Sequence, residues 1–456
     1  YQLGNNINLI TRSWTPICAS EEDGFTGNFD GNNYTISGLT IGSTTNSYEY
    51  IGLFSQNNGT ITNLKVEATS ITGNKYTGII AGANNGEIKN CFVKGLVSAE
   101  NYYTDDTALG GITGSNYGKI INCKSYAEIK NGNTNTGGIA GYSENNISNC
   151  SFMGIASDLD TKYFGGIVGY SKGDIKNCSN TGIINSYLNY MGGIAGYADS
   201  GVISLSSNIS SLTSKTTYDS YNGGLIGYNN NASVINCYSI GDITCENTSN
   251  YNTYVGGFVG YNNSSKYTEN SYCIGKVLGK TSSAFSNGPS MLYTNCFYNK
   301  TVQPTSETGA FGLNDNEMKD SEKYNEKFTF WDFNSVWGIN ENINNGYPYL
   351  LSMVIPATGI TISENEVTIA LGESIQLTAS VLPEDATNKS HIWTSSNNNI
   401  VSIDPNGIIT ANKIGTAVIT VKSTDGNFME KCDVTVVANT SLNETLIFKI
   451  DDFSTI

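Results

Sequence analysis

The hexapeptide Gly137-Gly138-Ile139-Ala140-Gly141-Tyr142 decides the fold, because it returns along the chain at a nearly constant spacing. Four further clear copies and three looser ones follow the same pattern: 165–170, 192–197, 223–228, 256–261, 50–56, 77–83 and 109–115. Successive copies are 27, 32, 27, 28, 27, 31 and 33 residues apart. A fixed period of roughly 20–50 residues is the signature of a repeat array, so we predict a solenoid of stacked coils.

Each repeat contains three short apolar segments separated by Gly, Asn and Ser turns, and no helical period of 3.6 residues is visible. In the repeat that starts at Gly137, these segments are marked by Ile139, Ile147 and Ala156. Three strands per coil predict an all-β, triangular parallel β-helix in which each strand pairs with its equivalent one coil away. Eight clear coils of about 4.8 Å each predict a rod of roughly 40 Å.

The cysteines follow the same period. Four of the ten lie nine residues after the fifth motif position of their own repeat: Cys91, Cys123, Cys150 and Cys178. Leu64 and Leu205 take this place in two other repeats, which favours an apolar stacking site and a ladder of buried free thiols. Scattered disulfides or a metal site are the alternatives, but the chain has no CxxC pair and a single histidine, His391.

An asparagine precedes each of these four cysteines. The four are Asn90, Asn122, Asn149 and Asn177. Asparagine side chains stacked at a bend can hydrogen-bond to one another along the solenoid axis. We therefore predict a structural ladder of asparagines beside the cysteine ladder.

Changes of composition divide the chain into five segments. Residues 301–353 leave the repeat, with a short charged helix predicted at 314–328 followed by an aromatic cluster. Residues 354–438 contain about seven short alternating strands, typical of an immunoglobulin-like β-sandwich with Trp393 as core aromatic. The predicted segments are an N-terminal cap (1–48), the repeat β-helix (49–300), a C-terminal cap and junction (301–353), the Ig-like domain (354–438) and a linker or the start of a further module (439–456).

Two resemblances follow from these residues. The GG-[ILF]-[AVI]-G-Y repeat, over roughly 50–300, resembles the GLUG motif of large bacterial surface proteins, although Ser55 and Ile79 replace glycines in early copies. The later segment looks like a bacterial Ig-like domain of group 2, on the text 371–373, 382–387, 393–396 and 407–411. Both resemblances imply an extracellular bacterial protein, such as an adhesin, a stalk or the non-catalytic part of a larger enzyme, and neither supplies catalytic residues.

Composition narrows the partners. The net charge is −16, with 24 basic and 40 acidic residues, so we expect no nucleic-acid partner, because no basic patch is present to neutralise phosphates. No run of 18 apolar residues occurs, so we expect no membrane insertion. The single His391 also leaves HExxH zinc chemistry and a Ser-His-Asp triad without their ligands. We therefore assign no catalytic residue, no metal site and no cofactor.

The variable segments before each Gly-Gly pair carry the candidate binding residues. Tyrosine, aspartate and asparagine there suit sugar or protein contact by stacking and adaptable hydrogen bonds. The predicted ligand-binding residues are Tyr102, Tyr103, Asp105, Asp106, Tyr251 and Tyr254. Calcium at Asp105-Asp106 or at 158–160 is an open alternative, although neither matches an EF-hand, and so is a row of solvated loops without a ligand.

The leading hypothesis is an extracellular, secreted or cell-surface adhesin or display protein. A rigid β-helical rod would bind a glycan or protein through loops on one corner, and the Ig-like domain would act as spacer. The first alternative is a carbohydrate-active enzyme, either a polysaccharide lyase or a glycosidase with paired carboxylates. The second is a structural subunit that assembles with neighbouring surface subunits.

Overall fold

The computed structural model describes residues 1–10, 12, 14–19, 24–42, 48–99, 107–132, 134–216, 218–247, 251–289, 292–303 and 309–439. The chain forms two compact units, Tyr1–Gly338 and Ile339–Ile456. The division between them falls inside the predicted cap and junction of 301–353. The predicted fold class, a parallel β-helix with a C-terminal Ig-like sandwich, is confirmed.

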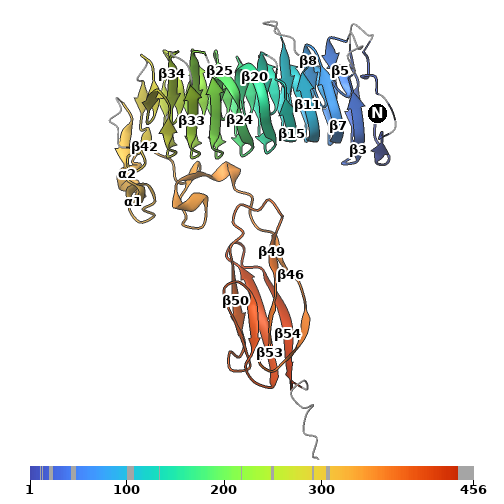
Figure 1. The fold of residues 1–456 in the computed structure, drawn as a ribbon, viewed down its shortest axis with the longest axis vertical. Coiled ribbons are helices and arrows are strands. Elements are labelled where there is room, and N and C mark those ends of the chain that lie inside the picture. Colours follow the sequence, from blue (N-terminus) through green and yellow to red (C-terminus); the bar gives the residue numbers. More distant parts are fainter. Residues whose placement is uncertain are drawn as a thin grey trace, which may run out of the picture. The chain divides into compact units, whose positions relative to one another are not determined.

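The first unit is a solenoid whose turns pass through three parallel sheets (Figure 1). The motif sheet carries the end of each hexapeptide and has nine strands, one per turn, so the solenoid has about nine turns. Its strands are β5 (Phe54–Asn57), β9 (Ala81–Asn84), β13 (Thr113–Asn116), β17 (Ala140–Ser143), β21 (Val168–Ser171), β25 (Ala195–Ala198), β30 (Ile226–Asn229), β35 (Val259–Asn262) and β40 (Ser286–Asn287).

The isoleucine sheet follows the motif sheet in each turn and has ten strands. Its register places Ile88, Ile120, Ile147 and Ile175 in one column. Its strands are β2 (Asn28–Asp30), β6 (Thr60–Thr62), β10 (Glu87–Lys89), β14 (Lys119–Ile121), β18 (Ile147–Ser148), β22 (Ile175–Lys176), β26 (Val202–Ser204), β31 (Ser233–Ile235), β36 (Thr268–Glu269) and β41 (Tyr293–Thr294).

The broad sheet closes each turn and has 24 strands, because most turns contribute two or three. They are β1 (Ile7–Asn8), β3 (Thr35–Ile41), β4 (Tyr50–Ile51), β7 (Lys65–Gly73), β8 (Tyr76–Gly78), β11 (Phe92–Ala99), β12 (Ala108–Gly110), β15 (Lys124–Lys130), β16 (Asn135–Gly137), β19 (Ser151–Phe152), β20 (Ile155–Gly165), β23 (Ser179–Asn180), β24 (Ile183–Gly192), β27 (Ser207–Asn208), β28 (Leu212–Thr216), β29 (Ser220–Gly223), β32 (Tyr238–Ser239), β33 (Ile243–Asn247), β34 (Thr253–Gly256), β37 (Tyr272–Cys273), β38 (Val277–Leu278), β39 (Thr281–Ser283), β42 (Phe297–Asn299) and β43 (Phe311–Leu313).

The strand that leads into each Gly-Gly pair was not predicted from the sequence. In β16 it consists of Asn135, Thr136 and Gly137, a polar stretch that reads as part of a variable loop. The structure pairs it with β12 and β20, and Thr136 is fully buried. Tertiary pairing across turns, and not local apolar content, therefore makes this segment a strand.

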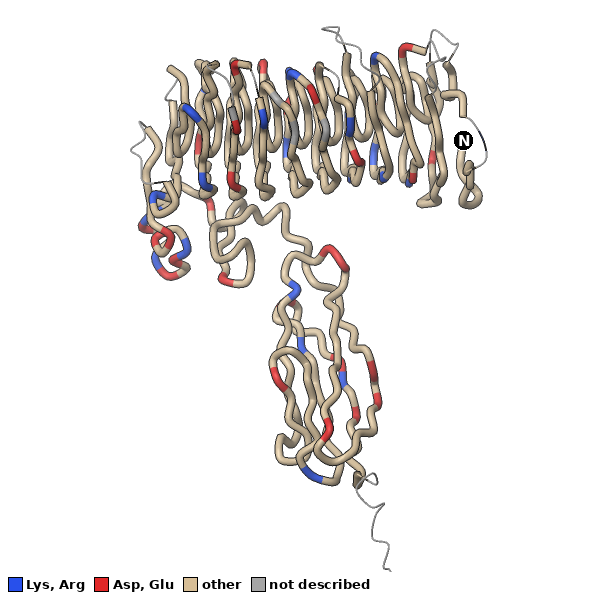
Figure 2. The backbone as a smooth tube through the Cα atoms, in the orientation of Figure 1, with Lys and Arg blue, Asp and Glu red and all other residues tan. Residues whose placement is uncertain are grey.

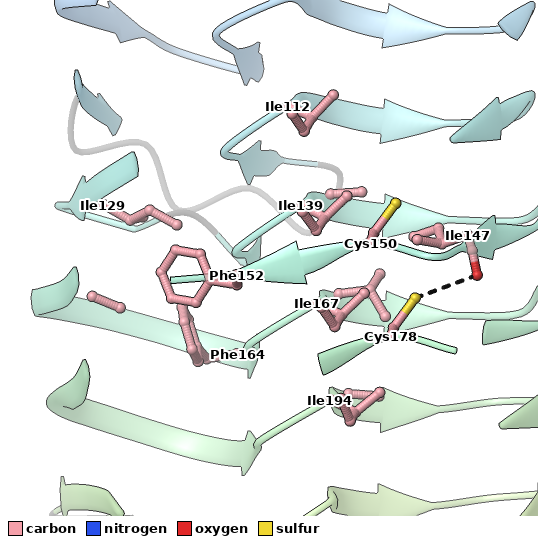
Figure 3. Close-up of a cluster of buried hydrophobic side chains, with 14 of the residues drawn as sticks. Ile112, Ile129, Ile139, Ile147, Cys150, Phe152, Phe164, Ile167, Cys178 and Ile194 are labelled. Atoms are coloured by element: carbon pink, nitrogen blue, oxygen red, sulfur yellow. Dashed lines mark hydrogen bonds between the residues drawn. The ribbon is translucent and has the colours of Figure 1, made fainter. Parts of the chain in front are cut away.

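The core of the solenoid consists of columns of like residues. Ile112, Ile139, Ile167 and Ile194 stack one above another, each fully buried, with Ile139 N donating to Ile167 O at 3.0 Å (Figure 3). Each isoleucine follows the Gly-Gly pair, where the chain turns from the broad sheet to the motif sheet. The glycines therefore set the corner, and the isoleucine behind them fills the interior.

Aromatic residues of the segment after the solenoid cover the broad sheet over three of its last turns, at Tyr238, Tyr272 and Phe297. Trp331 packs on Phe297, with ring centroids 5.7 Å apart, and its Nε1 donates to Asn295 O at 3.0 Å. Trp337 is fully buried, and its Nε1 donates to Asn236 Oδ1 at 3.3 Å. The predicted helix of 314–328 is two short helices, α1 (Asp315–Met318) and α2 (Tyr324–Lys327). The turn between them is held by Asp320 Oδ1, which accepts from the backbone N–H groups of residues 322 and 323 at 3.0 Å.

The second unit contains the β-sandwich, with Trp393 and the free Cys432 buried in its core. Its four-stranded sheet has the order β47-β54-β53-β50, its three-stranded sheet the order β48-β52-β51, and β46 pairs with β49. The strands are β46 (Gly359–Ile362), β47 (Glu366–Ala370), β48 (Ser374–Gln376), β49 (Ala379–Leu382), β50 (His391–Ser395), β51 (Val401–Ile403), β52 (Ile408–Ala411), β53 (Gly415–Ser423) and β54 (Met429–Val437). Short elements outside both sets are β44 (Trp337–Gly338), β45 (Tyr349–Leu350), η1 (Asn344–Gly346) and η2 (Leu351–Met353).

Candidate functional site: a tyrosine face on the solenoid

A row of tyrosines runs along the motif sheet. The sixth motif position falls in strands of identical register, so its side chains stack from turn to turn: Tyr142, Tyr170, Tyr197, Tyr228 and Tyr261. Ring centroids of successive members are 4.9–5.6 Å apart, and the interplanar angles are 2–25°. We call these five residues the motif row.

A second row comes from the broad sheet. Tyr163, Tyr190, Tyr221 and Tyr254 each lie two residues before a Gly-Gly pair and are in register with one another. Side chains alternate between the two faces of a strand. The four tyrosines are half-buried at the surface. The residues that follow them point inward and are buried: Phe164, Met191, Asn222 and Val255. We call the four tyrosines the flanking row.

The two rows interlock. Tyr163 meets Tyr170 and Tyr197 edge-on, at 5.5 and 5.3 Å between ring centroids. Tyr221 meets Tyr228 and Tyr261 in the same way, at 5.2 and 5.4 Å. Edge-to-face aromatic pairs are favourable beyond their buried area, by about 0.5–1.5 kcal/mol each. The nine tyrosines therefore form one ordered surface, which we call the tyrosine face.

Partial burial changes the acidity of this face. Burial raises the pKa of Tyr190 and, together with nearby Asp199, raises the pKa of Tyr197 to about 12. Burial also raises the pKa of Tyr142 to about 12, with a further contribution from its hydrogen bond to Glu144. Glu144 accepts a second hydrogen bond from Lys172 Nζ at 3.0 Å. The phenols of Tyr142, Tyr190 and Tyr197 are therefore neutral hydrogen-bonding groups at physiological pH.

This acidity predicts an alkaline transition. The folded-state pKa of Tyr197, about 12, lies above the ordinary tyrosine value of about 10, so folding favours the neutral phenol. Its contribution to stability is complete below about pH 10 and is lost as the pH rises from about 10 to about 12. A spectrophotometric phenolate titration should show a late phase that shrinks in Tyr197→Phe. Titration of every tyrosine in one phase near pH 10 would contradict the packing of the face.

Both rows break at the same place. In the flanking row, Ala108 and Asn135 occupy the two register positions between Tyr76 and Tyr163. In the motif row, Ser115 occupies the position next to Tyr142. The missing rings leave an open hollow of about 360 Å³ in the face. Its lining residues are Tyr76, Ala108, Tyr117, Thr134, Asn135, Tyr142, Lys162, Tyr163 and Tyr170.

The loop residues predicted to bind a ligand are only partly described. Tyr102, Tyr103, Asp105 and Asp106 lie outside the described residues. Tyr251 is exposed, with its ring 6.2 Å from that of Tyr218 on the preceding turn. Tyr254 instead belongs to the flanking row and stacks on Tyr221 at 5.4 Å. A second hollow of about 330 Å³ lies at the loop corner, lined by Asp160, Tyr187, Asn189, Lys215, Thr216 and Tyr218.

The predicted ladder cysteines lie in the interior. Cys91, Cys123, Cys150 and Cys178 are buried and free, and Cys178 Sγ donates to Ile147 O at 3.6 Å (Figure 3). Burial raises the pKa of Cys123 and Cys150 well above the ordinary value. Since the thiolate is the metal ligand and the nucleophile, these protonated thiols act as packing groups. Within the described residues no group of three or more His, Cys, Asp or Glu side chains could hold a metal ion.

The asparagine ladder has a backbone role that the sequence analysis did not predict. Asn90, Asn122, Asn149 and Asn177 have φ of 53–54°, the left-handed region that asparagine tolerates better than other side chains. Their side chains also bond along the axis, as from Asn122 Nδ2 to Asn90 Oδ1 at 2.8 Å. The same bend recurs at this position on successive turns. Its backbone conformation is therefore the first reason for an asparagine there, and the side-chain hydrogen bonds are the second.

The assignment of Leu205 to the cysteine position is wrong. Leu205 has a φ of 50° and occupies the asparagine position, whereas the buried Ser206 takes the place of cysteine. Ser206 Oγ accepts from Cys178 N at 3.1 Å. The turn before Val202 contains one extra residue. The cysteine position of this repeat therefore lies ten residues after the fifth motif position, and not nine. Leu64, by contrast, does occupy the cysteine position, following Asn63 with a φ of 52°.

Charges on the solenoid are sparse and mixed. Figure 2 shows basic and acidic residues spread along the unit, without a continuous basic stretch in the part of the chain that the structure describes. Of the loop carboxylates, Asp219 accepts from Asn252 N at 2.9 Å and Glu246 lies 3.7 Å from Lys215 Nζ. Among the helices of the described residues, none has the length and apolar character needed to cross a membrane.

Comparison with known proteins agrees with this architecture. The family of the GLUG motif matches residues 160–185 and 220–244, and the bacterial Ig-like domain (group 2) matches residues 356–434. An uncharacterized protein of Clostridium acetobutylicum is 42% identical over 85 residues, which are 18% of this chain and 21% of that protein. Halomucin of Haloquadratum walsbyi is 31% identical over 131 residues, 26% of this chain and 1% of its own length.

A third relative carries a saccharide in its name. The 3-O-alpha-D-galactosyl-alpha-L-arabinofuranosidase of Bifidobacterium longum is 29% identical over 150 residues, 31% of this chain and 12% of the relative. In each of these proteins the similar segment is about a fifth of the length or less. The chain thus combines GLUG motifs, carried by a β-solenoid, with a bacterial Ig-like domain of group 2.

Proposed function

We propose that this chain is part of an extracellular bacterial surface protein whose solenoid binds a polysaccharide through the tyrosine face. The observation that carries the proposal is the pair of interlocked tyrosine rows, which repeats once per turn. Packing already orders these rings, so a ligand meets apolar surface and hydroxyl groups with little loss of side-chain entropy. GLUG and group 2 Ig-like segments support the extracellular setting.

A repeating surface favours a repeating ligand. Successive rings of the motif row are 4.9–5.6 Å apart, so a chain molecule laid along the axis meets the same contacts at each turn. Globular protein surfaces generally lack such a period. The name of the Bifidobacterium longum relative, an arabinofuranosidase, adds support for a saccharide ligand.

The test is binding of the full chain to an array of polysaccharides, followed by variants of the face. Tyr190→Ala and Tyr228→Ala should each weaken binding about 10-fold, as expected for buried aromatic contacts. Tyr228→Phe keeps the ring and removes the hydroxyl, so it separates contact with the ring edge from hydrogen bonding.

The matched control is the exposed pair on the loop corner. Tyr218→Ala and Tyr251→Ala remove the same side chain outside the face, and binding should be unchanged. Loss of binding in these controls alone would assign recognition to the loops. Release of oligosaccharides during the assay would instead indicate an enzyme.

A further inference from the structure

The break in the tyrosine rows differs from the rest of the face in what it exposes. Inside the motif row both faces of each ring are covered, because neighbours stack at 2–25°. At the break, Ser115 stands where the next ring after Tyr142 would be, and Asn135 where the next ring after Tyr163 would be. On this side of Tyr142 lies Tyr117, with its ring centroid 6.0 Å away and its ring tilted by 56°. The aromatic partners of Tyr163 all follow it in the chain, so the Tyr163 ring is the stacking surface that the break leaves available to a sugar ring.

The size of the break suits a small unit of a larger ligand. Two register positions without a ring separate Tyr76 from Tyr163, so three turn spacings of about 4.8 Å, roughly 14 Å in all, lie between them. The hollow of about 360 Å³ falls in the usual range of small-molecule sites, about 300–1,000 Å³. It takes one or two sugar rings between aromatic walls.

The described lining of the hollow carries a positive charge. Among the described residues that line it, Lys162 is the one charged side chain, and its Nζ lies 5.1 Å from the centre of the Tyr163 ring. The two other lysines near the face are already paired, Lys75 with Glu49 and Lys172 with Glu144. Among the described residues no carboxylate forms an ion pair with Lys162, so its ammonium is available to a ligand anion. Asn135 adds a fixed polar group, since its Nδ2 donates to Thr107 O at 3.0 Å.

We propose that this hollow is a subsite for an acidic sugar unit, whose ring packs against Tyr163 while its anionic group pairs with Lys162. The proposal rests on the polysaccharide binding proposed above and adds the class of sugar and its place. A uronic acid carboxylate and a sulfate ester present the same charge to lysine. The net charge of −16 gives no long-range attraction to such a ligand, so selectivity comes from this short-range contact.

The test uses calorimetric titration of the full chain with three oligosaccharides of equal length: an oligogalacturonate, a sulfated oligogalactan and a neutral oligogalactan. At least one acidic probe should bind about 10-fold more tightly than the neutral one, and the better of the two identifies the anion as carboxylate or sulfate. Lys162→Gln should abolish this preference without weakening neutral binding. Equal binding of all three probes to the wild type would overturn the assignment of an acidic sugar.

A second variant fills the hollow. Ala108→Tyr adds a ring at the register position of the buried Ala108, which lines the hollow, and should weaken binding of the preferred probe at least 10-fold while the urea midpoint stays near that of the wild type. Thr281→Tyr is the matched control, because Thr281 continues the flanking row beyond Tyr254, away from the hollow. Unchanged binding in Ala108→Tyr, together with weaker binding in Tyr190→Ala and Tyr228→Ala, would overturn the subsite and leave the tyrosine face in place. Failure of the wild type to bind any saccharide would overturn the proposed function itself.

Discussion

Alanine at position 138 is expected to prevent the solenoid from folding. A Cβ atom on Gly138 would lie 2.0 Å from the carbonyl oxygen of Gly166 on the next turn and 2.3 Å from Cγ of Phe152. The first neighbour is backbone of an adjacent coil, which cannot move without breaking the hydrogen bonds that hold the turns together. We expect a loss of roughly 4 kcal/mol or more, the range reserved for severe overpacking.

The measurement is the urea midpoint of the solenoid transition followed by circular dichroism. The matched control is Gly4→Ala, because a Cβ there meets nothing within 4 Å, and its midpoint should equal that of the wild type. A Gly138→Ala protein with a wild-type midpoint would show that the corner accommodates a Cβ atom, which would contradict the close packing described here.

Truncating Phe164 is the second large effect. Phe164 is fully buried next to the Gly-Gly corner, within the cluster drawn in Figure 3. Phe164→Ala removes most of a buried ring and leaves a cavity, which costs about 3–5 kcal/mol. The urea midpoint should fall accordingly. Phe330→Ala makes the same chemical change at a side chain that is 74% exposed, and should leave the midpoint nearly unchanged. Equal shifts in the two variants would contradict the assignment of Phe164 to the core.

The fold could be predicted because each coil repeats the same constraints. A Gly-Gly corner followed by an isoleucine, and an asparagine followed by a cysteine, mark two of the bends in the sequence itself. The strand leading into the corner was missed because Asn135 and Thr136 have no apolar pattern of their own, and only pairing with equivalent strands makes it regular. The displacement of Leu205 was missed because counting from the motif cannot detect one inserted residue.

The tyrosine face was missed for a different reason. Its signal is present, since Tyr163, Tyr190, Tyr221 and Tyr254 each precede a Gly-Gly pair by two residues. Sequence reasoning placed recognition in the variable loops, where tyrosines are also frequent, and included Tyr254 as a loop residue. The two rows interlock because of the way the broad sheet meets the motif sheet at the corner. The sequence does not show that geometry. The break at Ala108 and Asn135 becomes visible only once the register is known.

Hydroxyl-radical footprinting tests whether a polysaccharide lies on the tyrosine face. The full chain is oxidised with and without a saturating amount of a polysaccharide selected from the array, and tyrosine modification is read by mass spectrometry. We predict protection of Tyr190, Tyr197 and Tyr228, with Tyr218 and Tyr251 unchanged. Protection confined to Tyr218 and Tyr251 would show that the ligand does not lie on the tyrosine face. So would modification of every tyrosine to the same extent with and without the polysaccharide.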